Sequence, residues 1–582
     1  MVYKGPSRGC YTCRKRRVKC DEVRPECGNC KKRKQPCSGY RDLFDTLHKD
    51  ETHTHTHTAA HNNKKAPSKK NPRVEIAEDL DIALDDLVSP ELNTSSTTSS
   101  STPQSGDALM LIEPTRNAEA ECLAYFFVNY VNIPRDPSTN IFIEHILPLY
   151  LNSSLDSALT QAANAVAINV TQMWMARYMD SYLARGTYAR AVSLLKCALE
   201  DPIESKSDDT LAAVFLLDFY DSLNKRFVGF IDNGTHQQGA VALLRHRGEE
   251  NFKSPTSQRL FTALRSRHIS FSMQTGQRVM LNEDLLTEDT AILPSAKLDL
   301  INAELADLHV AAAEGPETIG TSAVEYYQSI IKRALVIAQK LEAWRNSLPK
   351  SWQSVPIPAS ELHPSIRAAG VYGDTVDVYS SLTVSHVNNA SRSSHVGAFR
   401  LIALCQRELK ALGVETDHRL HSNIISRTQE IVDRFCASVP YHLGNRTTLT
   451  FPHEHSEYPH VPDELRKLAN YVDPFGNPVE MTQEDHIRAA AAIGGWFVMT
   501  PLSNFLRAPA LQWPNSQPGP LVSHLRPGQM DWIRGQMKRL QAIYGLPTAS
   551  TSNWQFPIRN LRLGGDKTSG PFKVLNRQLW QV

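Results

Sequence analysis

Six of the ten cysteines in this chain lie between positions 10 and 37, at spacings that repeat after seventeen residues. The six are Cys10, Cys13, Cys20, Cys27, Cys30 and Cys37. Each half of the repeat begins with two cysteines separated by two residues, a spacing that places two thiolates within reach of one zinc ion. The N-terminus lacks the apolar stretch of a secretory signal. We therefore expect metal ligands rather than disulfides, which are rare in proteins that are not exported.

The number of cysteines predicts how the metals are shared. Three thiolates in each half leave a tetrahedral zinc ion one ligand short. Two cysteines that each bridge both metals would complete two zinc sites, and the repeat makes Cys10 and Cys27 the natural bridges. A segment of this size has too small a core to fold by itself, so the two zinc ions should supply its folding free energy.

Positive charge is concentrated in the same segment. Residues 1–41 contain thirteen lysines and arginines but three acidic residues, whereas the whole chain of 582 residues has a formal net charge of +2. This asymmetry indicates that the N-terminal segment meets a polyanion such as DNA. The candidate DNA-binding residues are Arg14, Lys15, Arg16, Arg17, Lys19, Lys31, Lys32, Arg33 and Lys34. A solvated face or a nuclear-import signal is the alternative interpretation of each basic run.

The stretch GCYTCRKRRVKCDEVRPECGNCKKRKQPC closely resembles the fungal Zn2Cys6 binuclear-cluster family of transcription factors. The resemblance includes all six ligands, the basic run, Asp21 and Pro25, and it covers about 30 of the 582 residues. It implies a DNA-binding domain at residues 1–41, two zinc ions, double-stranded DNA as the partner, and the nucleus as the location. A structural zinc knuckle for protein contacts is the alternative.

The resemblance also implies roles for individual residues. A helix at Arg14–Lys19 would enter the major groove, with Arg17 contacting a CGG-like triplet, because arginine can bond to guanine O6 and N7 together. Lys31–Lys34 would contact phosphates. Pro25 would follow a cis peptide bond in the turn between the halves.

Residues 42–114 predict a disordered linker. Leu43 and Leu47 begin no heptad seam, so a dimerising zipper is absent and the oligomeric state stays open. The Thr-His tract at 52–58 is low-complexity sequence or a weak metal site. Residues 74–92 alternate seven acids with apolar residues, which is typical of an activation segment that binds a coactivator, although a solvated short helix has the same pattern.

Residues 115–582 predict a large all-α domain. Apolar residues recur at helical spacing over 188–199, over 236–247 with Gly248 ending that helix, and over 322–347 with Pro349 beyond it. Thr482 is a candidate N-cap. The phrases HQQGAVALLRHRG, LEAWRNSLP and GGWFVMTPL resemble the fungal-specific transcription factor regulatory domain, which implies a helical domain that senses a metabolite or partner.

This large domain contains no nucleophile elbow, phosphate-binding loop, dinucleotide fingerprint or zinc-protease motif, so we expect no enzyme. His453, Glu454 and His455, with Glu457 and His460, are read as a solvated loop rather than a metal site. The remaining cysteines are expected in the core: Cys122, Cys197, Cys405 and Cys436. The longest apolar run, 489–499, is too short to span a membrane, so no membrane partner is expected.

These observations predict a small metal-stabilised Zn2Cys6 module and a large all-α domain, joined by a disordered linker. The predicted function is zinc-dependent, sequence-specific DNA binding that regulates RNA polymerase II genes, with activation favoured. The alternatives are a repressor on the same DNA, and a metabolite-binding protein or enzyme that uses the basic segment for localisation.

Overall fold

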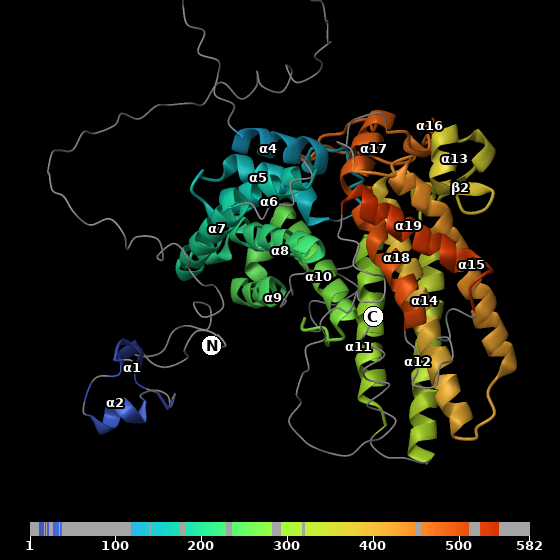
Figure 1. Ribbon diagram of the computed structural model, residues 1–582, viewed down its shortest axis with the longest axis horizontal. Helices are drawn as coiled ribbons and strands as arrows, with labels where there is room; N and C mark the ends of the chain where they lie inside the picture. The colour runs from blue at the N-terminus through green and yellow to red at the C-terminus, as the bar shows by residue number, and fades with distance from the viewer. Residues whose placement is uncertain are drawn as a thin grey trace, which may run out of the picture. The chain divides into compact units, whose positions relative to one another are not determined.

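The computed structural model of this chain forms two compact units, Met1–Thr115 and Arg116–Val582, which we call unit 1 and unit 2 (Figure 1). The structure describes residues 11–16, 18, 20–21, 27–33, 35, 37, 118–139, 141–174, 182–228, 235–281, 293–316, 321–449, 456–510 and 524–545. The predicted linker 42–114, with its acidic segment 74–92, lies outside these residues. A cysteine cluster near the N-terminus and a large, mostly helical remainder are as predicted.

The described residues of unit 1 include two short helices, α1 (Tyr11–Lys15) and α2 (Gly28–Lys32). Each has five residues, and each carries one cysteine of a Cys-x2-Cys pair. The cysteine cluster lies between them and is described with the metal centre.

The N-terminal part of unit 2 is a stack of helices (Figure 1). Its elements are α4 (Ala118–Phe126), π-helical η2 (Phe127–Val131), η3 (Phe142–His145), α5 (Ile146–Asn152), α6 (Ala158–Trp174), α7 (Tyr182–Glu200), η4 (Glu204–Lys206), α8 (Asp208–Val228), α9 (Thr235–Arg247), η5 (Glu249–Phe252) and α10 (Pro255–Thr275). The alanine-rich α6 is buried along most of its length and packs against α4, α7 and α8. Small side chains allow this close packing of helices.

Three helices in this stack, α6, α8 and α10, begin with the same type of cap. The Ser157 hydroxyl accepts a hydrogen bond from the Thr160 amide at 3.1 Å, before α6, and Ser207 and Thr210 repeat the contact at 3.1 Å before α8. Ser254 caps α10 in the same way. A serine at this position satisfies an amide that has no partner within the helix, which sets where each helix begins.

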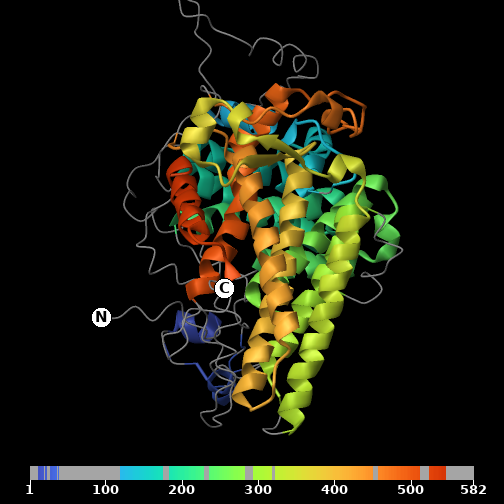
Figure 2. The same ribbon diagram turned by 90° about the vertical axis from the view of Figure 1, so that its right-hand side faces the viewer.

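Four long helices form the second part of unit 2 and run side by side (Figure 2). They are α11 (Pro294–Glu314), α12 (Thr321–Asn346), α14 (Leu382–Ala411) and α15 (His418–Leu443). One continuous apolar core connects them, and Leu305, Leu341 and Ile402 are among its fully buried members. The burial of such side chains is the main source of stability of a helical unit.

A small sheet between α12 and α14 corrects the prediction of an all-α domain. Strand β1 (Val355–Pro358) pairs in antiparallel fashion with β2 (Thr375–Val378), and η8 (Lys350–Trp352), η9 (Ala359–Glu361) and α13 (Pro364–Gly370) surround them. Each strand has only four residues, and β1 contains two prolines. The alternating pattern of the two strands is therefore too weak to be recognised in the sequence. The β2 side chains Val376 and Val378 are fully buried and join the core.

The C-terminal part of unit 2 packs against α14 and α15. Its elements are α16 (Asp463–Arg466), α17 (Gln483–Ala489), π-helical η10 (Ala490–Gly494), α18 (Gly495–Ala510) and α19 (Gln529–Ile543). Among the described residues, Gln483–Leu506 is long and apolar enough to cross a membrane by length and composition alone. Of its most apolar 18-residue stretch, 61% is buried inside the protein. The packing of the core therefore explains its apolar composition.

Several predicted helix ends are confirmed. Helix α9 ends at Arg247, where Gly248 has a φ of 73°, a conformation that favours glycine. Helix α12 ends at Asn346, before Pro349, and Thr482 caps α17 in a capping box with Asp485.

The predicted burial of individual residues is confirmed in part. Cys405 and Cys436 are core residues, but Cys197 is exposed and Cys122 half-buried, so the prediction for these two was wrong. Leu199, the last residue of the apolar pattern predicted over 188–199, is also 46% exposed. Cys197 and Leu199 flank the buried Ala198 near the C-terminal end of α7, so both point away from the packed face of this helix.

Candidate metal centre and nucleic-acid interface

The seventeen-residue repeat of the sequence is also a repeat of the backbone. Helices α1 and α2 begin and end at equivalent positions of the two halves. After α1 the Val18 amide donates to the Cys13 carbonyl at 3.0 Å, and after α2 the Gln35 amide donates to the Cys30 carbonyl at 3.1 Å. A hydrogen bond that spans five residues in this way is a usual end of a helix. The sequence therefore folds the two halves alike, each around its Cys-x2-Cys pair.

The predicted helix Arg14–Lys19 is wrong in its C-terminal half. Helix α1 ends at Lys15, Arg16 lies in a turn, and Val18 is outside the helix. The chain must leave the helix early because Cys20 has to return beside Cys13 and Cys27. Arg17 and Lys19 lie outside the described residues.

The described cysteine sulfurs form two groups of three, Cys13–Cys20–Cys27 and Cys27–Cys30–Cys37, and within each group they lie within 4.8 Å of one another. The sulfurs of Cys13 and Cys27 are 3.6 Å apart. Two thiolates at about 2.3 Å from one tetrahedral zinc ion are about 3.8 Å apart, whereas a disulfide joins sulfurs at about 2.05 Å. The donor set and its spacing therefore fit zinc and not a disulfide.

Cys27 belongs to both groups and is fully buried. Its sulfur also accepts a hydrogen bond from the Cys30 amide at 3.3 Å, so it caps α2. The residue that caps α2 is therefore also the one that the two groups of sulfurs share. Cys10, the equivalent residue of the first half, lies outside the described residues.

Two polar contacts join the halves of the module in addition to the sulfurs. The Gly28 amide donates to the Asp21 carboxylate at 3.0 Å, and the Arg16 guanidinium donates to the Gln35 side-chain carbonyl at 2.8 Å. Gly28 leaves space for Asp21, because a Cβ atom at this position would lie 2.3 Å from a carboxylate oxygen. Sequence reasoning noted Asp21 after the third cysteine but did not assign it this contact.

The basic residues lie on the outside of the cysteine cluster. Lys15, Lys31, Lys32 and Arg33 are exposed, and Arg16 is half-buried. The side chains of Arg14, Arg17, Lys19 and Lys34 lie outside the described part of the chain. Two short helices that present cations at equivalent positions form a surface with the charge that nucleic acid requires.

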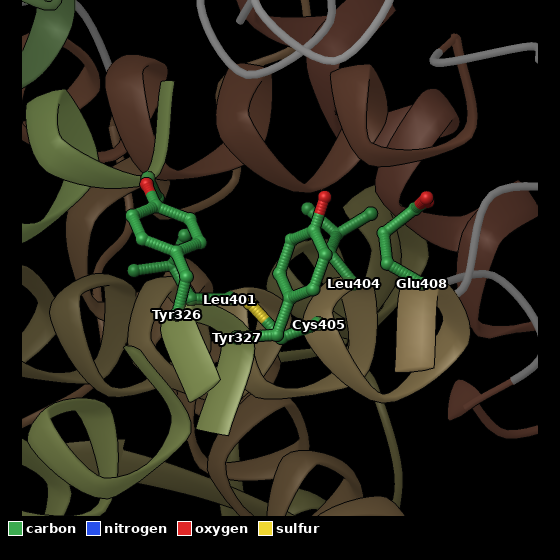
Figure 3. Close-up of a pocket in the computed structure, with 7 residues that line it drawn as sticks. Tyr326, Tyr327, Leu401, Leu404, Cys405 and Glu408 are labelled. Atoms are coloured by element: carbon green, nitrogen blue, oxygen red, sulfur yellow. The ribbon is translucent and has the colours of Figure 1, made fainter. Parts of the chain in front are cut away.

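Unit 2 contains a small pocket between α11, α12 and α14, with an empty volume of about 250 Å³ that includes open solvent (Figure 3). The residues that line it are Ala312, Tyr326, Tyr327, Leu401, Leu404, Cys405 and Glu408. Burial raises the pKa of the Cys405 thiol to about 12, with a smaller contribution from the charge of Glu408. This thiol is therefore protonated near neutral pH, a form that is a weak nucleophile.

The histidine-rich loop around residues 453–460, which the sequence predicts to be solvated, is described only in its second part. His453, Glu454 and His455 lie outside the described residues, while Glu457 and His460 are described. Among the described residues, the two cysteine groups are the sets of three or more close metal-ligand side chains.

Comparison with known proteins identifies the cysteine segment. Residues 8–46 match the family described as Fungal Zn(2)-Cys(6) binuclear cluster domain. Similar proteins include White-opaque regulator 2 of Candida albicans, 63% identical over 35 residues, and an uncharacterized transcriptional regulatory protein of Schizosaccharomyces pombe, 66% identical over 32 residues. Sterol uptake control protein 2 of Candida albicans is 54% identical over 39 residues. The matches span 6–7% of this chain and 6–8% of the relatives.

The N-terminal segment of this protein is thus a Zn2Cys6 binuclear cluster domain, and its cofactor is a pair of zinc ions. No solved structure matches the chain. The assignment of residues 115–582 to the fungal-specific regulatory domain stays a prediction.

Proposed function

We propose that this protein is a zinc-dependent, sequence-specific DNA-binding regulator of RNA polymerase II genes in the nucleus. The observation that carries the proposal is the pair of cysteine groups that share Cys27, flanked by two exposed basic helices in the same seventeen-residue register. Similarity to proteins named as transcriptional regulatory proteins supports it. The proposed zinc ligands are Cys10, Cys13, Cys20, Cys27, Cys30 and Cys37, with Cys10 and Cys27 as bridges.

The proposed division of work follows from the module's own residues. When bound, zinc cross-links the two halves and holds the cysteines as thiolates. Asp21 and Arg16 then fix the relative orientation of the halves through Gly28 and Gln35. Because the Arg16 guanidinium donates to Gln35, we assign Arg16 to positioning and phosphate contact rather than to base reading.

Arg17 and Lys34 occupy equivalent positions in the repeat and provide a matched test. We propose that Arg17 reads guanine of a CGG-like triplet, whereas Lys34 and its neighbours Lys31, Lys32 and Arg33 contact phosphates. Selection of sites from random DNA by the full-length protein should recover this triplet. Arg17→Ala should cost about 1–3 kcal/mol of discrimination between matched and mismatched sites. Lys34→Ala should weaken binding to all sequences alike and lower the salt slope by about one.

Equal loss across all sequences for both variants would contradict the assignment of Arg17 as the reader. The number of triplets in the selected site also reports the oligomeric state. One triplet indicates a monomer, whereas two at a fixed spacing indicate a dimer, which would have to form without a zipper.

Activation is proposed from residues 74–92, whose acids and apolar residues suit binding to a coactivator. Full-length protein lacking residues 74–92 should give lower reporter output at unchanged DNA occupancy. A higher output would assign the protein as a repressor on the same DNA.

A further inference from the structure

Arg16 and Arg33 occupy equivalent positions in the two halves of the cysteine module, seventeen residues apart. Arg16 follows α1 directly, and Arg33 follows α2 directly. Their side chains nevertheless have different surroundings. Arg16 is half-buried and donates to the Gln35 side-chain carbonyl at 2.8 Å, whereas Arg33 is exposed. The repeat therefore supplies one arginine twice, and a glutamine of the second half holds the copy in the first half.

The side chain at one position of the repeat explains this difference. Gln35 in the second half corresponds to Val18 in the first half, and the backbone amide of each donates to the carbonyl of the second cysteine of its own Cys-x2-Cys pair. The backbone is therefore placed alike at the two positions. A valine side chain offers no hydrogen-bond acceptor, so the equivalent contact from Arg33 to Val18 cannot form.

The acceptor on Gln35 is an uncharged amide, so it orients the guanidinium without neutralising it. In the described part of the module, Asp21 is the one acidic residue, and its carboxylate accepts the Gly28 amide at 3.0 Å. Arginine has several N–H donors, and a single acceptor atom leaves others for a further ligand. Arg16 and its exposed neighbour Lys15 therefore present positive charge, and the direction of the Arg16 side chain is set by a neutral partner.

Restraint of this side chain in advance affects how it binds an anion. A long side chain that moves freely in solution loses conformational entropy when a ligand immobilises it, and this loss weakens binding. The hydrogen bond to Gln35 already restrains the Arg16 guanidinium. Phosphate oxygens accept charge-assisted hydrogen bonds from arginine, often from two N–H groups at once, so the orientation of the guanidinium matters for this contact.

We propose that Gln35 is a positioning residue for DNA binding, which holds the Arg16 guanidinium ready to donate to a phosphate of the DNA backbone. Gln35 acts through Arg16 and carries no charge, so it is not among the basic residues that the charge pattern selects as DNA contacts. The inference rests on the proposed DNA-binding function and names a residue that raises the affinity of that surface.

The test is equilibrium binding of the full-length zinc-loaded protein to two DNA duplexes over a range of salt concentrations. One duplex carries the site selected from random DNA, and the other has the same composition in scrambled order. Gln35→Ala should weaken binding to both duplexes by about 2–10-fold, the cost of one side chain that is no longer held in advance. The salt slope should not change, because the variant removes no charge.

A double-mutant cycle separates the action of Gln35 through Arg16 from an independent contact. Arg16→Ala should lower the salt slope by about one, and Gln35→Ala added to it should cause no further loss. Arg33→Ala is the matched control from the equivalent position, and in that background Gln35→Ala should keep its full effect. Additive losses for Gln35→Ala and Arg16→Ala would overturn the proposal.

Zinc affinity distinguishes positioning from a structural role in the module. The sulfurs and the contact between Asp21 and Gly28 still join the halves in Gln35→Ala, so competition with a chromophoric chelator should give the zinc affinity of the parent. Gln35→Glu keeps an acceptor for Arg16 but adds a negative charge, so its salt slope should fall by about one while zinc binding stays the same.

Two further outcomes would overturn the proposal: a zinc affinity of Gln35→Ala that falls in step with its DNA binding, and DNA binding by Gln35→Ala that equals that of the parent. Failure of the parent to prefer the selected duplex would contradict the proposed sequence-specific function instead. The cycle with Arg16 is measured on either duplex, so the two failures are distinguishable.

Discussion

The cysteine module and unit 2 achieve a buried interior in opposite ways. The fully buried side chains described in the module are Cys13, Cys27 and Cys30, so its interior is sulfur. The interior of unit 2 is a continuous set of aliphatic and aromatic side chains between long helices. The difference teaches that the described residues of the module form no apolar core with which to fold, so we expect metal binding and folding to be one event there. The described residues of unit 2 supply an apolar core of their own.

Zinc removal should separate the two regions most strongly. A chelator should unfold the module, because structural zinc sites of this type contribute about 10–16 kcal/mol of folding free energy. DNA binding should be lost, while the unfolding midpoint of unit 2 stays the same. Calorimetry and near-UV circular dichroism of the full-length protein, with and without chelator, measure both effects. A simultaneous loss of the unit 2 transition would contradict the independence of the two interiors.

Truncation of a core side chain of unit 2 should destabilise that unit and leave the cysteine module folded. Trp352 is fully buried, packs edge-to-face on Trp344 and donates to the Ser138 hydroxyl at 2.8 Å. Trp352→Ala should therefore reduce the stability of unit 2 by about 3–5 kcal/mol, because it leaves a cavity and removes one hydrogen bond to the Ser138 hydroxyl. The zinc content of the variant should not change. Phe475→Ala, at a 57% exposed site, is the matched control and should shift stability by less than about 0.5 kcal/mol.

The same contrast explains how much could be read from the sequence. Metal ligands need fixed spacing, so the cysteines predicted both the cluster and its repeat, and Gly248 and Thr482 predicted helix ends through local backbone chemistry. Contacts between distant residues leave no local signal. The exposure of Cys197 and the pairing of β1 with β2 depend on packing, and the early end of α1 depends on the return of Cys20.

Acid should weaken both regions for different reasons. His486 is buried and stacks on Tyr441 at 4.4 Å, and its pKa is lowered to about 3, first by burial and then by the charge of Arg466. A lowered folded-state pKa means that the unfolded chain binds the proton first, so stability is lost as pH falls from about 6.5 toward 3. The loss is about 1.4 kcal/mol per pH unit for each such histidine.

Chemical denaturation of the full-length protein at a series of pH values measures this slope. His486→Phe keeps an aromatic ring beside Tyr441 and removes the titrating group, so the slope should be shallower for unit 2. The module also loses its thiolates in acid, but there excess zinc should restore folding because metal and protons compete for the same sulfurs. Restoration of the unit 2 transition by zinc would contradict the separation of the two mechanisms.

Replacement of a helical glycine by alanine should stabilise unit 2 but weaken the cysteine module. Gly239 lies on the exposed side of α9, and a Cβ atom there would meet nothing within 4 Å. Gly239→Ala should therefore stabilise unit 2 by up to about 1 kcal/mol, because alanine loses less backbone entropy in a helix. Gly28 is also helical, but its Cβ would lie 2.3 Å from the Asp21 carboxylate, so Gly28→Ala must displace Asp21.

The displaced carboxylate would weaken the bond from the Gly28 amide that joins the two halves beside the bridging position of Cys27. We expect Gly28→Ala to lower zinc affinity by about 10-fold, the lower end of the effect of losing a residue that orients metal ligands. Competition with a chromophoric chelator measures this affinity, and thermal unfolding measures the gain from Gly239→Ala. If Gly28→Ala left the zinc affinity unchanged and Gly239→Ala left the stability unchanged, the polar contact between Asp21 and Gly28 would not stabilise the module. The sulfurs alone would then hold its halves together.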